Sequence, residues 1–490
     1  MLLRHILGYG PANIVPAVVS FLSIYVFTRL ISPEAYGAYA LAISVSLLCQ
    51  AVFFYWLQVG ATRFVARAAE ERDLGAFTAT IYRAFAASSA ALAVVYATVM
   101  VLLPHPSAMV RHALWLGLAL VLARSLTAVS QSFNRGSLRV GRYNLIECGQ
   151  SLLGFGFGLV LVVVFHREGQ GILLGLIAGA AVMAVVSLAG ERPLLVGASW
   201  AAKPAPGRIA RLLAFGLPLT IYNAMNFVLS TSDRLLVDHF LGAAAVGVYS
   251  VSYNVMDRAL TSVFLAVSLA AFPLAVNKLE REGPEAARRQ LSHNATALLA
   301  LALPACAGLI ALQRPLAAIL IGDRFRPEAL QIMPFIALAS LLAGFQIHFF
   351  DHAFSLGKRT HLLVWSVGPA AVLNVVLNIV LLPRLGLRGA AYATLASYGA
   401  SLVGSIVVGR RSFAIDFPLR PLIKIGLCTC AMLAALRLAR FPPTALGLCA
   451  LIALGAATYA AAAVVANVGG VRTLLWGRWA SGQRLQDAPP

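Results

Sequence analysis

Long apolar runs, separated by short polar connections, follow one another along almost the whole chain. Many of these runs approach the roughly 20 residues that an α-helix needs to cross a bilayer. The strict alternation of apolar and polar positions that indicates strands is missing from the sequence, and open strands cannot satisfy their backbone groups in hydrocarbon. The pattern therefore predicts an all-α polytopic membrane protein.

We expect about 14 transmembrane helices from these runs. Their expected ranges are about 8 to 30, 37 to 60, 80 to 103, 112 to 133, 145 to 165, 171 to 190, 213 to 232, 246 to 272, 293 to 313, 329 to 354, 361 to 382, 389 to 408, 421 to 440 and 444 to 466. Only Arg4 precedes the first run as a charged residue, and no small-residue cleavage site follows it. We therefore expect an uncleaved first span.

Composition and charge agree with this class. Hydrophobic residues make up 60% of the chain and charged residues 11%, against about 25% charged residues in soluble domains. Most of the 38 Lys and Arg residues fall in connections on one side of the expected membrane, which the positive-inside rule assigns to the cytoplasm together with both termini. A net charge of +20 distributed in this way argues against a nucleic-acid-binding protein.

Two stretches repeat the same order of residues, which indicates an internal duplication. Residues 10–46 and 215–259 both contain Gly and Pro, an apolar helix, Arg-Leu and then Gly-x-Tyr. The matched positions include Arg29 with Arg234, Gly37 with Gly247 and Tyr39 with Tyr249. Six spans per repeat is an even number, so the halves should share one orientation and be related by an axis along the membrane normal.

The repeat divides the chain into two bundles with an extension. We predict an N-terminal six-helix bundle (1–195), a cytoplasmic linker (196–212), a C-terminal six-helix bundle (213–410), transmembrane helices 13 and 14 (411–470) and a cytoplasmic tail (471–490). The cytoplasmic connections after spans two and eight carry clustered arginines, which predicts either interfacial amphipathic helices or solvated loops.

Little extramembrane chain remains for enzyme chemistry. No connection is long enough for a domain, and neither a GxSxG elbow nor a phosphate-binding GxxxxGK[ST] loop is present in the sequence. The six cysteines lie in or beside apolar runs and indicate small core residues rather than a disulfide framework or a metal site. We therefore expect neither an enzyme nor a cofactor.

Charged residues inside spans are the strongest functional candidates, because each costs about 2.5–3.5 kcal/mol at the bilayer centre. Arg124 lies in the middle of span four, and Asp257 and Arg258 lie in the middle of span eight. Adjacent helical residues diverge by about 100°, so we expect Arg258 to face a water-filled interior. Asp257 is expected to pair with a cation on another helix, such as Arg124, and a purely structural ion pair is the alternative.

Span seven carries a polar stripe at spacings of three, four and three, formed by Asn223, Asn226, Ser230 and Asp233. A polar stripe on a spanning helix lines water or a partner helix. Gly and Pro at matching positions of spans one and seven point to a transporter binding site. Arg29 and Arg234 end these two helices on the far side, where an interfacial anchor is the alternative role.

His348, Asp351 and His352 share one helix face near the cytoplasmic end of span ten. A proton relay is one interpretation of this spacing, and helix termination with snorkelling is the other. Asn374 and Asn378, four residues apart on span eleven, are expected to bridge helices.

With these residues laid out, the chain resembles a known family. The stretch FGLPLTIYNAMNFVLSTSDRLLVDHFLGAAAVGVYSVSYNVMDRA, together with FTRLISPEAYGAYALAIS and LGLRGAAYATLAS, is similar to the polysaccharide-transporter family of lipid-linked oligosaccharide flippases. This family belongs to the multidrug/oligosaccharidyl-lipid/polysaccharide exporter superfamily, with multidrug and toxin extruders and the lipid II flippase. The resemblance spans about residues 1 to 465 and depends on the Arg-Leu-x-Ser-Pro-x-x-Tyr-Gly and Asp-Arg-x-Leu patterns.

The resemblance implies two six-helix bundles around a central cavity, plus two C-terminal helices. It implies a multi-pass transporter of a bacterial inner membrane that flips an isoprenoid-diphosphate-linked oligosaccharide from the cytoplasmic to the periplasmic leaflet by alternating access. The implied partners are the lipid-linked glycan, the bilayer, and polysaccharide polymerase and chain-length proteins; we expect a monomer, with H⁺ or Na⁺ as a coupling ion. A lipid II flippase and a cation-coupled multidrug extruder are the alternatives.

Such a cargo needs cationic and hydrogen-bonding groups. The residues expected to contact its diphosphate are Arg29, Arg124, Arg234 and Arg258, because a guanidinium can contact phosphate oxygens in a bidentate way. The residues expected to contact sugars are Asn223, Asn226, Tyr249, Tyr253 and Asn254. Those expected to serve in ion coupling are Asp233, Asp257, His348 and Asp351. Two arginines against one aspartate in mid-span favour an anionic cargo over a cationic drug.

Overall fold

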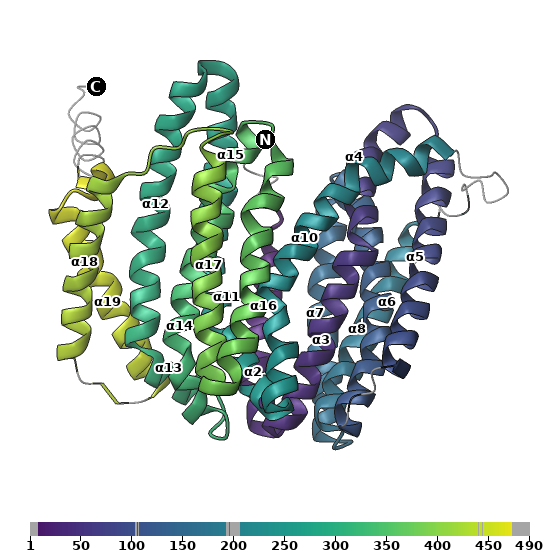
Figure 1. The fold of residues 1–490 in the computed structure, drawn as a ribbon, viewed down its shortest axis with the longest axis horizontal. Coiled ribbons are helices and arrows are strands. Elements are labelled where there is room, and N and C mark those ends of the chain that lie inside the picture. The colour runs from purple at the N-terminus through teal and green to yellow at the C-terminus, as the bar shows by residue number, and fades with distance from the viewer. Residues whose placement is uncertain are drawn as a thin grey trace, which may run out of the picture. The chain divides into compact units, whose positions relative to one another are not determined.

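The computed structural model describes residues 8–102, 105, 107–192, 196, 206–439, 441–442 and 444–472. These residues form helices and connections, with no strand among them (Figure 1). Fourteen of these helices are long and apolar enough to cross a membrane. The predicted all-α polytopic class is confirmed.

The spanning helices are α2 (Gly10–Leu30), α3 (Pro33–Phe53), α5 (Leu74–Leu102), α6 (Ala108–Gly136), α7 (Val140–Val163), α8 (Glu168–Gly190), α10 (Pro206–Leu241), α11 (Ala243–Glu282), α12 (Pro284–Ala311), α14 (Arg326–Phe345) continued by η1 (Gln346–Phe350) and α15 (His352–Leu356), η2 (Thr360–Leu362) continued by α16 (Leu363–Leu385), α17 (Leu387–Gly409), α18 (Leu419–Leu438) and α19 (Ala445–Val465). Three shorter elements accompany them, namely α4 (Tyr55–Glu70), α13 (Gln313–Leu320) and η3 (Val468–Gly470).

Several helices extend beyond their predicted ends. The sequence predicts span seven over 213 to 232, whereas α10 runs from Pro206 to Leu241. Hydropathy marks only the apolar part of a helix, and the backbone hydrogen bonds continue into polar sequence. For the same reason the connection after span eight forms the ends of α11 and α12, which meet at Gly283 with a φ of +87°. Neither a separate helix nor an extended loop occurs there, and a position of these helix ends at the membrane surface stays a prediction. After span two, by contrast, α4 is a separate helix, and its interfacial role stays a prediction.

The chain divides into two compact units. The first comprises Met1–Val251, Gly322–Phe325 and Ala371–Ala390, and the second comprises Ser252–Ile321, Arg326–Ala370 and Ala391–Pro490. These boundaries differ from those of the predicted six-helix bundles, which stay a prediction.

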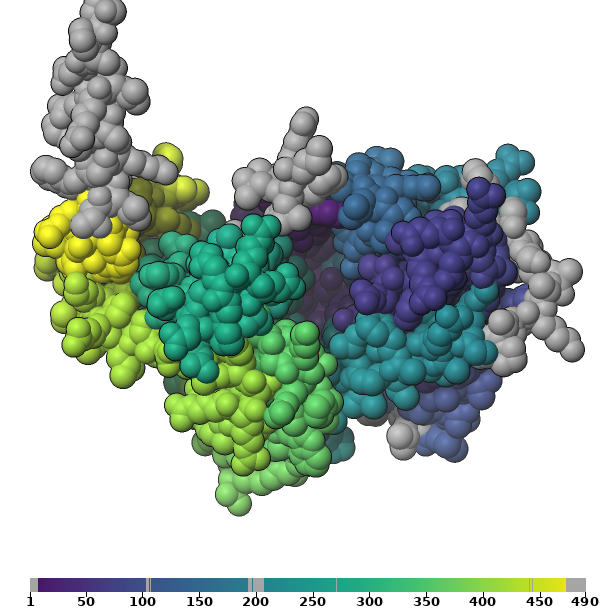
Figure 2. All heavy atoms as spheres, turned by 90° about the horizontal axis from the view of Figure 1, so that it is seen from above, coloured from purple at the N-terminus to yellow at the C-terminus, as the bar shows by residue number. Residues whose placement is uncertain are grey.

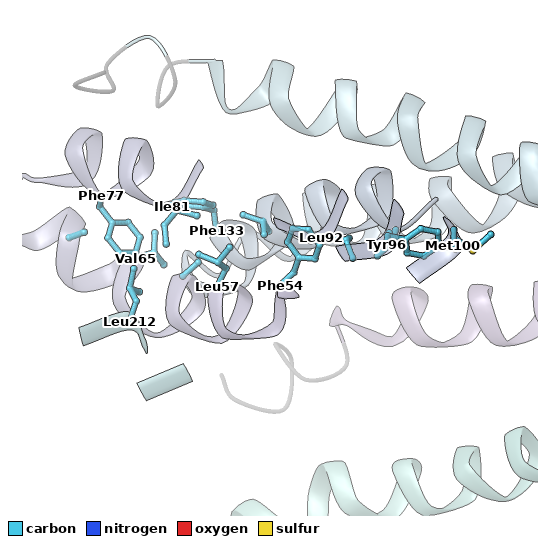
Figure 3. Close-up of a cluster of buried hydrophobic side chains, with 14 residues drawn as sticks. Phe54, Leu57, Val65, Phe77, Ile81, Leu92, Tyr96, Met100, Phe133 and Leu212 are labelled. Atoms are coloured by element: carbon cyan, nitrogen blue, oxygen red, sulfur yellow. The ribbon is translucent and has the colours of Figure 1, made fainter. Parts of the chain in front are cut away.

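A buried apolar cluster joins α4, α5 and α6 in the first unit, and Figure 3 shows its labelled side chains following one another between these helices. Phe54, at the break between α3 and α4, is completely buried in this cluster. Phe77 of α5 contacts Phe133 of α6 edge to face, with ring centroids 6.1 Å apart. Leu212 brings the first turns of α10 into the same core. Burial of these side chains fixes α4 against three spanning helices.

The two matched hairpins turn by different means. Between α2 and α3, Ser32 accepts a hydrogen bond from the backbone N–H of Ala35, and Pro33 occupies the first helical position. Ser at the N-cap and Pro at N1 are favoured helix starts. Between α10 and α11, Gly242 adopts a φ of +84°, a conformation that is not strained for glycine. The Ser-Pro pattern thus caps a helix in one repeat only.

The matched glycines Gly37 and Gly247 lie against one another. A Cβ atom on Gly37 would overlap the carbonyl oxygen of Ala243 and lie 3.1 Å from the backbone nitrogen of Gly247. A Cβ on Gly247 would overlap the carbonyl oxygen of Pro33 and lie 3.2 Å from the nitrogen of Gly37. Only glycine allows the first turns of α3 and α11 to approach this closely.

A buried carboxyl group at the end of α8 joins three helices of the first unit. Glu191 is 1% exposed. Tyr82 of α5 donates a hydrogen bond of 2.5 Å to Glu191 Oε2, and Ser130 of α6 donates to Oε1 and also contacts Ser187 of α8. Burial raises the pKa of Glu191 above its ordinary value of 4.5, although the bonds from Ser130 and Tyr82 oppose this shift. The sequence patterns did not single out Glu191, which directly follows the predicted sixth span (171 to 190).

We expect Gly37→Ala to destabilise the protein by about 1–3 kcal/mol, because the added methyl group has no room between α3 and α11. Gly156→Ala on α7 is the matched control, since nothing lies within 4 Å of a Cβ there; it should be neutral or stabilising by roughly 0.5–1 kcal/mol. Unfolding midpoints of the purified proteins in detergent test this. Equal midpoints for the two variants would contradict the close approach.

Glu191→Gln should change how stability depends on pH. A raised native pKa means that the native state binds this proton more tightly than the unfolded state, so stability falls as pH rises from about 4.5 through the native pKa. The loss is about 1.4 kcal/mol per unit of separation between the two values. Glutamine has no charge to lose, so the variant should gain stability relative to the natural protein at pH 8 and not at pH 4.

Thermal unfolding across this pH range measures the difference. Glu168→Gln, at an exposed acid that starts the same helix, is the control and should follow the natural profile. Parallel profiles for Glu191→Gln and the natural protein would refute the shift.

Candidate functional site

A buried carboxylate, Asp233, is the centre of the polar side chains on α10. The Asp233 side chain is 0% exposed. Tyr249 Oη, from α11, donates a hydrogen bond of 2.6 Å to Asp233 Oδ2, and Asn378 Nδ2, from α16, donates one of 2.7 Å to Oδ1. Donors from two other helices thus bind the acid that the sequence proposed for ion coupling.

Amide oxygens lie beside this carboxylate. Asn374 and Asn378 are one turn apart on α16 and are both fully buried. Asn374 Oδ1 accepts hydrogen bonds from Ser232 Oγ at 3.1 Å and from Asn378 Nδ2 at 3.3 Å. Asn378 Oδ1 is buried and has no hydrogen-bond partner in the described part of the chain. The prediction that these asparagines bridge helices is confirmed: Asn378 bonds to Asp233 and Asn374 to Ser232, both on α10.

Arg234 follows Asp233 and is also buried, at 8% exposure. Its Nε donates to Ser250 Oγ at 3.2 Å, and its Nη1 donates to the carbonyl oxygen of Ser230 at 2.9 Å. The guanidinium carbon lies 6.0 Å from the centre of the Tyr249 ring, within cation–π range. Arg234 is therefore held against α11, and its predicted diphosphate contact stays a prediction.

The polar stripe on α10 belongs to an unbroken helix. Asn223, Asn226 and Ser230 are half-buried, and Asn226 Nδ2 donates to the carbonyl oxygen of Tyr222 at 3.1 Å. The sequence predicted an interruption by Gly and Pro, but α10 continues through Pro218. A proline removes one backbone donor, and flanking turns can keep the helix going.

Asp257 and Arg258 lie next to one another on α11 and have different surroundings. Asp257 is half-buried, and its Oδ1 accepts a hydrogen bond of 3.0 Å from Ser340 Oγ on α14. The side chain of Arg258 is exposed. The structure agrees with the expected divergence of the two side chains. The predicted pairing of Asp257 with Arg124 stays a prediction.

The aromatic residues predicted to contact sugars are buried. Tyr249 is 0% exposed, and its hydroxyl donates to Asp233. Tyr253, one helical turn further, is 7% exposed, and its hydroxyl lies 3.4 Å from that of Tyr398 on α17. Asn254 is half-buried. Sugar contacts by these residues stay predictions.

Two further predicted arginines lie in the first unit. Arg29, at the end of α2, is exposed; its Nη1 donates to the carbonyl oxygen of Tyr25 at 2.7 Å, and its guanidinium lies 4.0 Å from the centre of that ring. Such a contact suits an interfacial anchor. Arg124 is half-buried in α6.

His348 and Asp351 lie at a π-helical segment that the sequence did not reveal. The backbone N–H of Asp351 donates to the carbonyl oxygen of Gln346, five residues earlier. Asp351 Oδ1 accepts a hydrogen bond of 2.7 Å from Ser405 on α17, and the His348 ring stacks on Phe264 with centroids 5.7 Å apart. His352 contacts the Phe272 ring of α11, with centroids 4.1 Å apart. The expected shared face therefore holds for the two histidines and is wrong for Asp351, which bonds to α17 instead. π-helical turns often occur at functional sites.

An apolar groove runs along the second unit between α11, α12, α18 and α19. Its volume is about 370 Å³. Its lining includes Ala259 and Val263 of α11, Leu301 of α12, Met432 of α18 and Tyr459 of α19. Ala259 directly follows Arg258 in the sequence, and Arg258 itself is not among the residues that line the groove.

The described ranges hold no group of residues suited to metal or disulfide chemistry. No cluster of three His, Cys, Asp or Glu side chains that could hold a metal occurs among them. All six cysteines are free thiols.

Comparison with known proteins gives the family. A family model described as "Polysaccharide biosynthesis protein" matches residues 26–329. The chain is also 23% identical to a probable low-salt glycan biosynthesis flippase, Agl15, of Haloferax volcanii over 292 residues, which are 59% of this chain and 59% of that protein. The match therefore covers less than two thirds of this relative.

Solved structures show the fold. The lipid II flippase MurJ in an inward closed conformation has a TM-score of 0.77 with 15% identity, covering 95% of this chain and 99% of that chain. An inward-facing multidrug resistance MATE family transporter of the MOP superfamily has a TM-score of 0.65 with 15% identity, covering 82% and 94%. The chain therefore has the fold of these membrane proteins and, since the family model matches more than half of its residues, it belongs to the polysaccharide biosynthesis protein family.

Proposed function

We propose that this protein is a transporter that flips an isoprenoid-diphosphate-linked oligosaccharide from the cytoplasmic to the periplasmic leaflet of a bacterial inner membrane by alternating access. In this proposal the product supplies surface polysaccharide synthesis, and both termini lie in the cytoplasm. The observation that carries the proposal is an exposed guanidinium, Arg258, inside an apolar span whose acidic neighbour, Asp257, is bonded to another helix. Membership of a polysaccharide biosynthesis family supports the cargo class.

The physics of the cargo explains why such an arginine is useful. Hydrocarbon rejects a pyrophosphate and a headgroup rich in hydroxyls, so a carrier must offer cationic and polar side chains at membrane depth. A guanidinium in a span costs about 2.5–3.5 kcal/mol, which an anionic ligand offsets through bidentate hydrogen bonds. Arg258 would bind the diphosphate in this way, and Arg124, Arg29 and Arg234 would be further partners along the route.

The cargo's hydrocarbon tail needs a separate surface. The groove between α11, α12, α18 and α19 is lined mainly by apolar side chains and begins one residue after Arg258. In this proposal the isoprenoid chain lies in this groove while Arg258 binds the diphosphate. The half-buried amides of Asn223, Asn226 and Asn254 would offer hydrogen bonds to the sugar hydroxyls.

Two alternatives use the same fold. A lipid II flippase would carry the same lipid diphosphate, and the likeness to MurJ keeps this cargo in consideration. A cation-coupled multidrug extruder would need acids to bind a cationic drug. Here two arginines, Arg124 and Arg258, stand against one aspartate, Asp257, in mid-span, which favours an anionic cargo.

We further propose that Asp233 binds a coupling ion, Na⁺ or H⁺. Support comes from the oxygens grouped around it: its own carboxylate, Asn374 Oδ1, and the buried Asn378 Oδ1 that accepts no hydrogen bond in the described ranges. Carboxylate and amide oxygens are suitable ligands for a hard cation. Since Tyr249 of α11 also bonds to Asp233, an ion arriving there would change the contact between α10 and α11.

Arg258→Ala should reduce transport at least tenfold, because the variant loses a bidentate anion contact worth about 1.5–3 kcal/mol. The measurement is flipping of labelled lipid-linked oligosaccharide in proteoliposomes, with lipid II as a second cargo, together with recovery of surface glycan in a flippase-deficient strain. Arg384→Ala, at an exposed arginine near the end of α16, is the control and should retain activity. Full recovery of surface glycan by Arg258→Ala at normal membrane abundance would refute the binding of the diphosphate by Arg258. If the natural protein transports lipid II and not the oligosaccharide lipid, lipid II is the cargo.

Asp233→Asn should abolish the dependence of transport on a Na⁺ or proton gradient, since the variant keeps the shape and loses the charge. Transport rates in proteoliposomes with each gradient imposed separately test this and identify the ion. Asp416→Asn, at an exposed acid, should leave the dependence unchanged. An Asp233→Asn protein that still responds to the same gradient would show that the ion binds elsewhere.

A further inference from the structure

A second cavity of the second unit shares no residue with the groove described above. Its volume is about 550 Å³, and it lies between α12, the segment from α14 to α15, and α17, under the α17–α18 connection (residues 410–418). Figure 1 shows this connection passing across α12 on its way to α18. The lining is mostly apolar and aromatic: Leu299, Phe345, Phe350, Leu402, Ile406, Phe413 and Phe417.

The opening of this cavity is basic. Arg410 lines it and is exposed, and Arg288 of α12 lies over the Phe413 ring, with its guanidinium carbon 5.8 Å from the ring centre. Arg288 Nε is buried and makes no hydrogen bond within the described part of the chain. Arg359 donates from Nη1 to the carbonyl oxygen of Arg411 at 3.1 Å, which brings further positive charge to the same connection. One exposed acid, Asp416, also lines the cavity.

We propose that this cavity binds a phospholipid with an anionic headgroup, such as phosphatidylglycerol. One acyl chain lies among the phenylalanine rings, and the phosphate is bound by Arg410 and Arg288. The size suits a ligand pocket, and basic pockets between membrane helices are known to bind anionic headgroups. The two guanidinium groups of Arg410 and Arg288 outnumber the single acid, Asp416, at this opening, and an anionic headgroup would offset the remaining positive charge.

The contacts of the α17–α18 connection indicate which elements a bound lipid would stabilise. Phe417 stacks on Phe350 of the π-helical segment, with centroids 5.9 Å apart and ring planes at 19°. Figure 2 shows the turn between α11 and α12 (teal-green) next to the α17–α18 connection (yellow-green), in agreement with the contact of Arg288 with Phe413. A bound lipid therefore joins α12, the π-helical segment and the connection, and stabilises them together. This role is separate from cargo binding at Arg258.

Native mass spectrometry of the full-length protein in detergent tests the proposal, with phosphatidylglycerol or phosphatidylcholine added. The natural protein should retain one phosphatidylglycerol at least tenfold more tightly than phosphatidylcholine. Arg410→Glu should weaken the retained lipid about tenfold, from the loss of attraction and the added repulsion. Ile406→Trp should weaken it by filling the cavity while keeping every charge. Arg437→Glu, at an exposed arginine near the end of α18, should retain the lipid.

Three results would overturn the assignment. The first is equal retention of both lipids, and the second is equal behaviour of Arg410→Glu and Arg437→Glu. The third concerns competition by a polyisoprenyl phosphate. If this compound displaces phosphatidylglycerol from the natural protein but not from the Arg258→Ala variant, the cavity belongs to the cargo site. If Ile406→Trp does not fold, binding of glycerol phosphate to the natural protein is measured instead. Binding as tight as that of the whole lipid would mean that only the charged headgroup is recognised, and would refute an acyl chain bound in the cavity.

Discussion

A buried polar side chain on a spanning helix needs a hydrogen-bond partner from the protein, because hydrocarbon offers none. Asp233, Asp257 and Asp351 each accept a hydrogen bond from a hydroxyl group on a neighbouring helix, namely from Tyr249, Ser340 and Ser405 respectively. These bonds fix the helices against one another at the same positions that the sequence proposes for ion coupling.

The class and number of spans followed from the sequence because hydropathy reports burial in lipid directly. The ends of the helices could not be predicted from hydropathy, because α10 and α11 continue beyond their apolar parts. The π-helical segment Gln346–Phe350 could not be predicted either, since every spacing argument assumes the α-helical turn. For Asp351, α-helical spacing therefore gives the wrong face, and the ion-coupling roles of His348 and Asp351 stay predictions.

Only the residues of the candidate site that lie in one helical hairpin, α10 and α11, could be predicted from the sequence. Asp233 and Tyr249 are both candidates from the sequence, but for different roles, whereas the structure bonds one to the other. Their third partner, Asn378, lies 145 residues from Asp233, and no pattern within one sequence links such distant positions. Glu191 was missed for the same reason, because its donors Tyr82 and Ser130 come from other helices.

The contact between Gly37 and Gly247 joins positions that the predicted repeat treats as equivalent. Equivalent surfaces in mutual contact are the mark of a twofold interface, as in a dimer of identical subunits. Two identical half-length chains would have the same residues on both sides of such an interface. A single chain can have different residues on the two sides. Here α3 starts with Ser32 and Pro33, whereas α11 starts after Gly242. A single chain that carries both predicted repeats can therefore use different residues on the two sides of this contact.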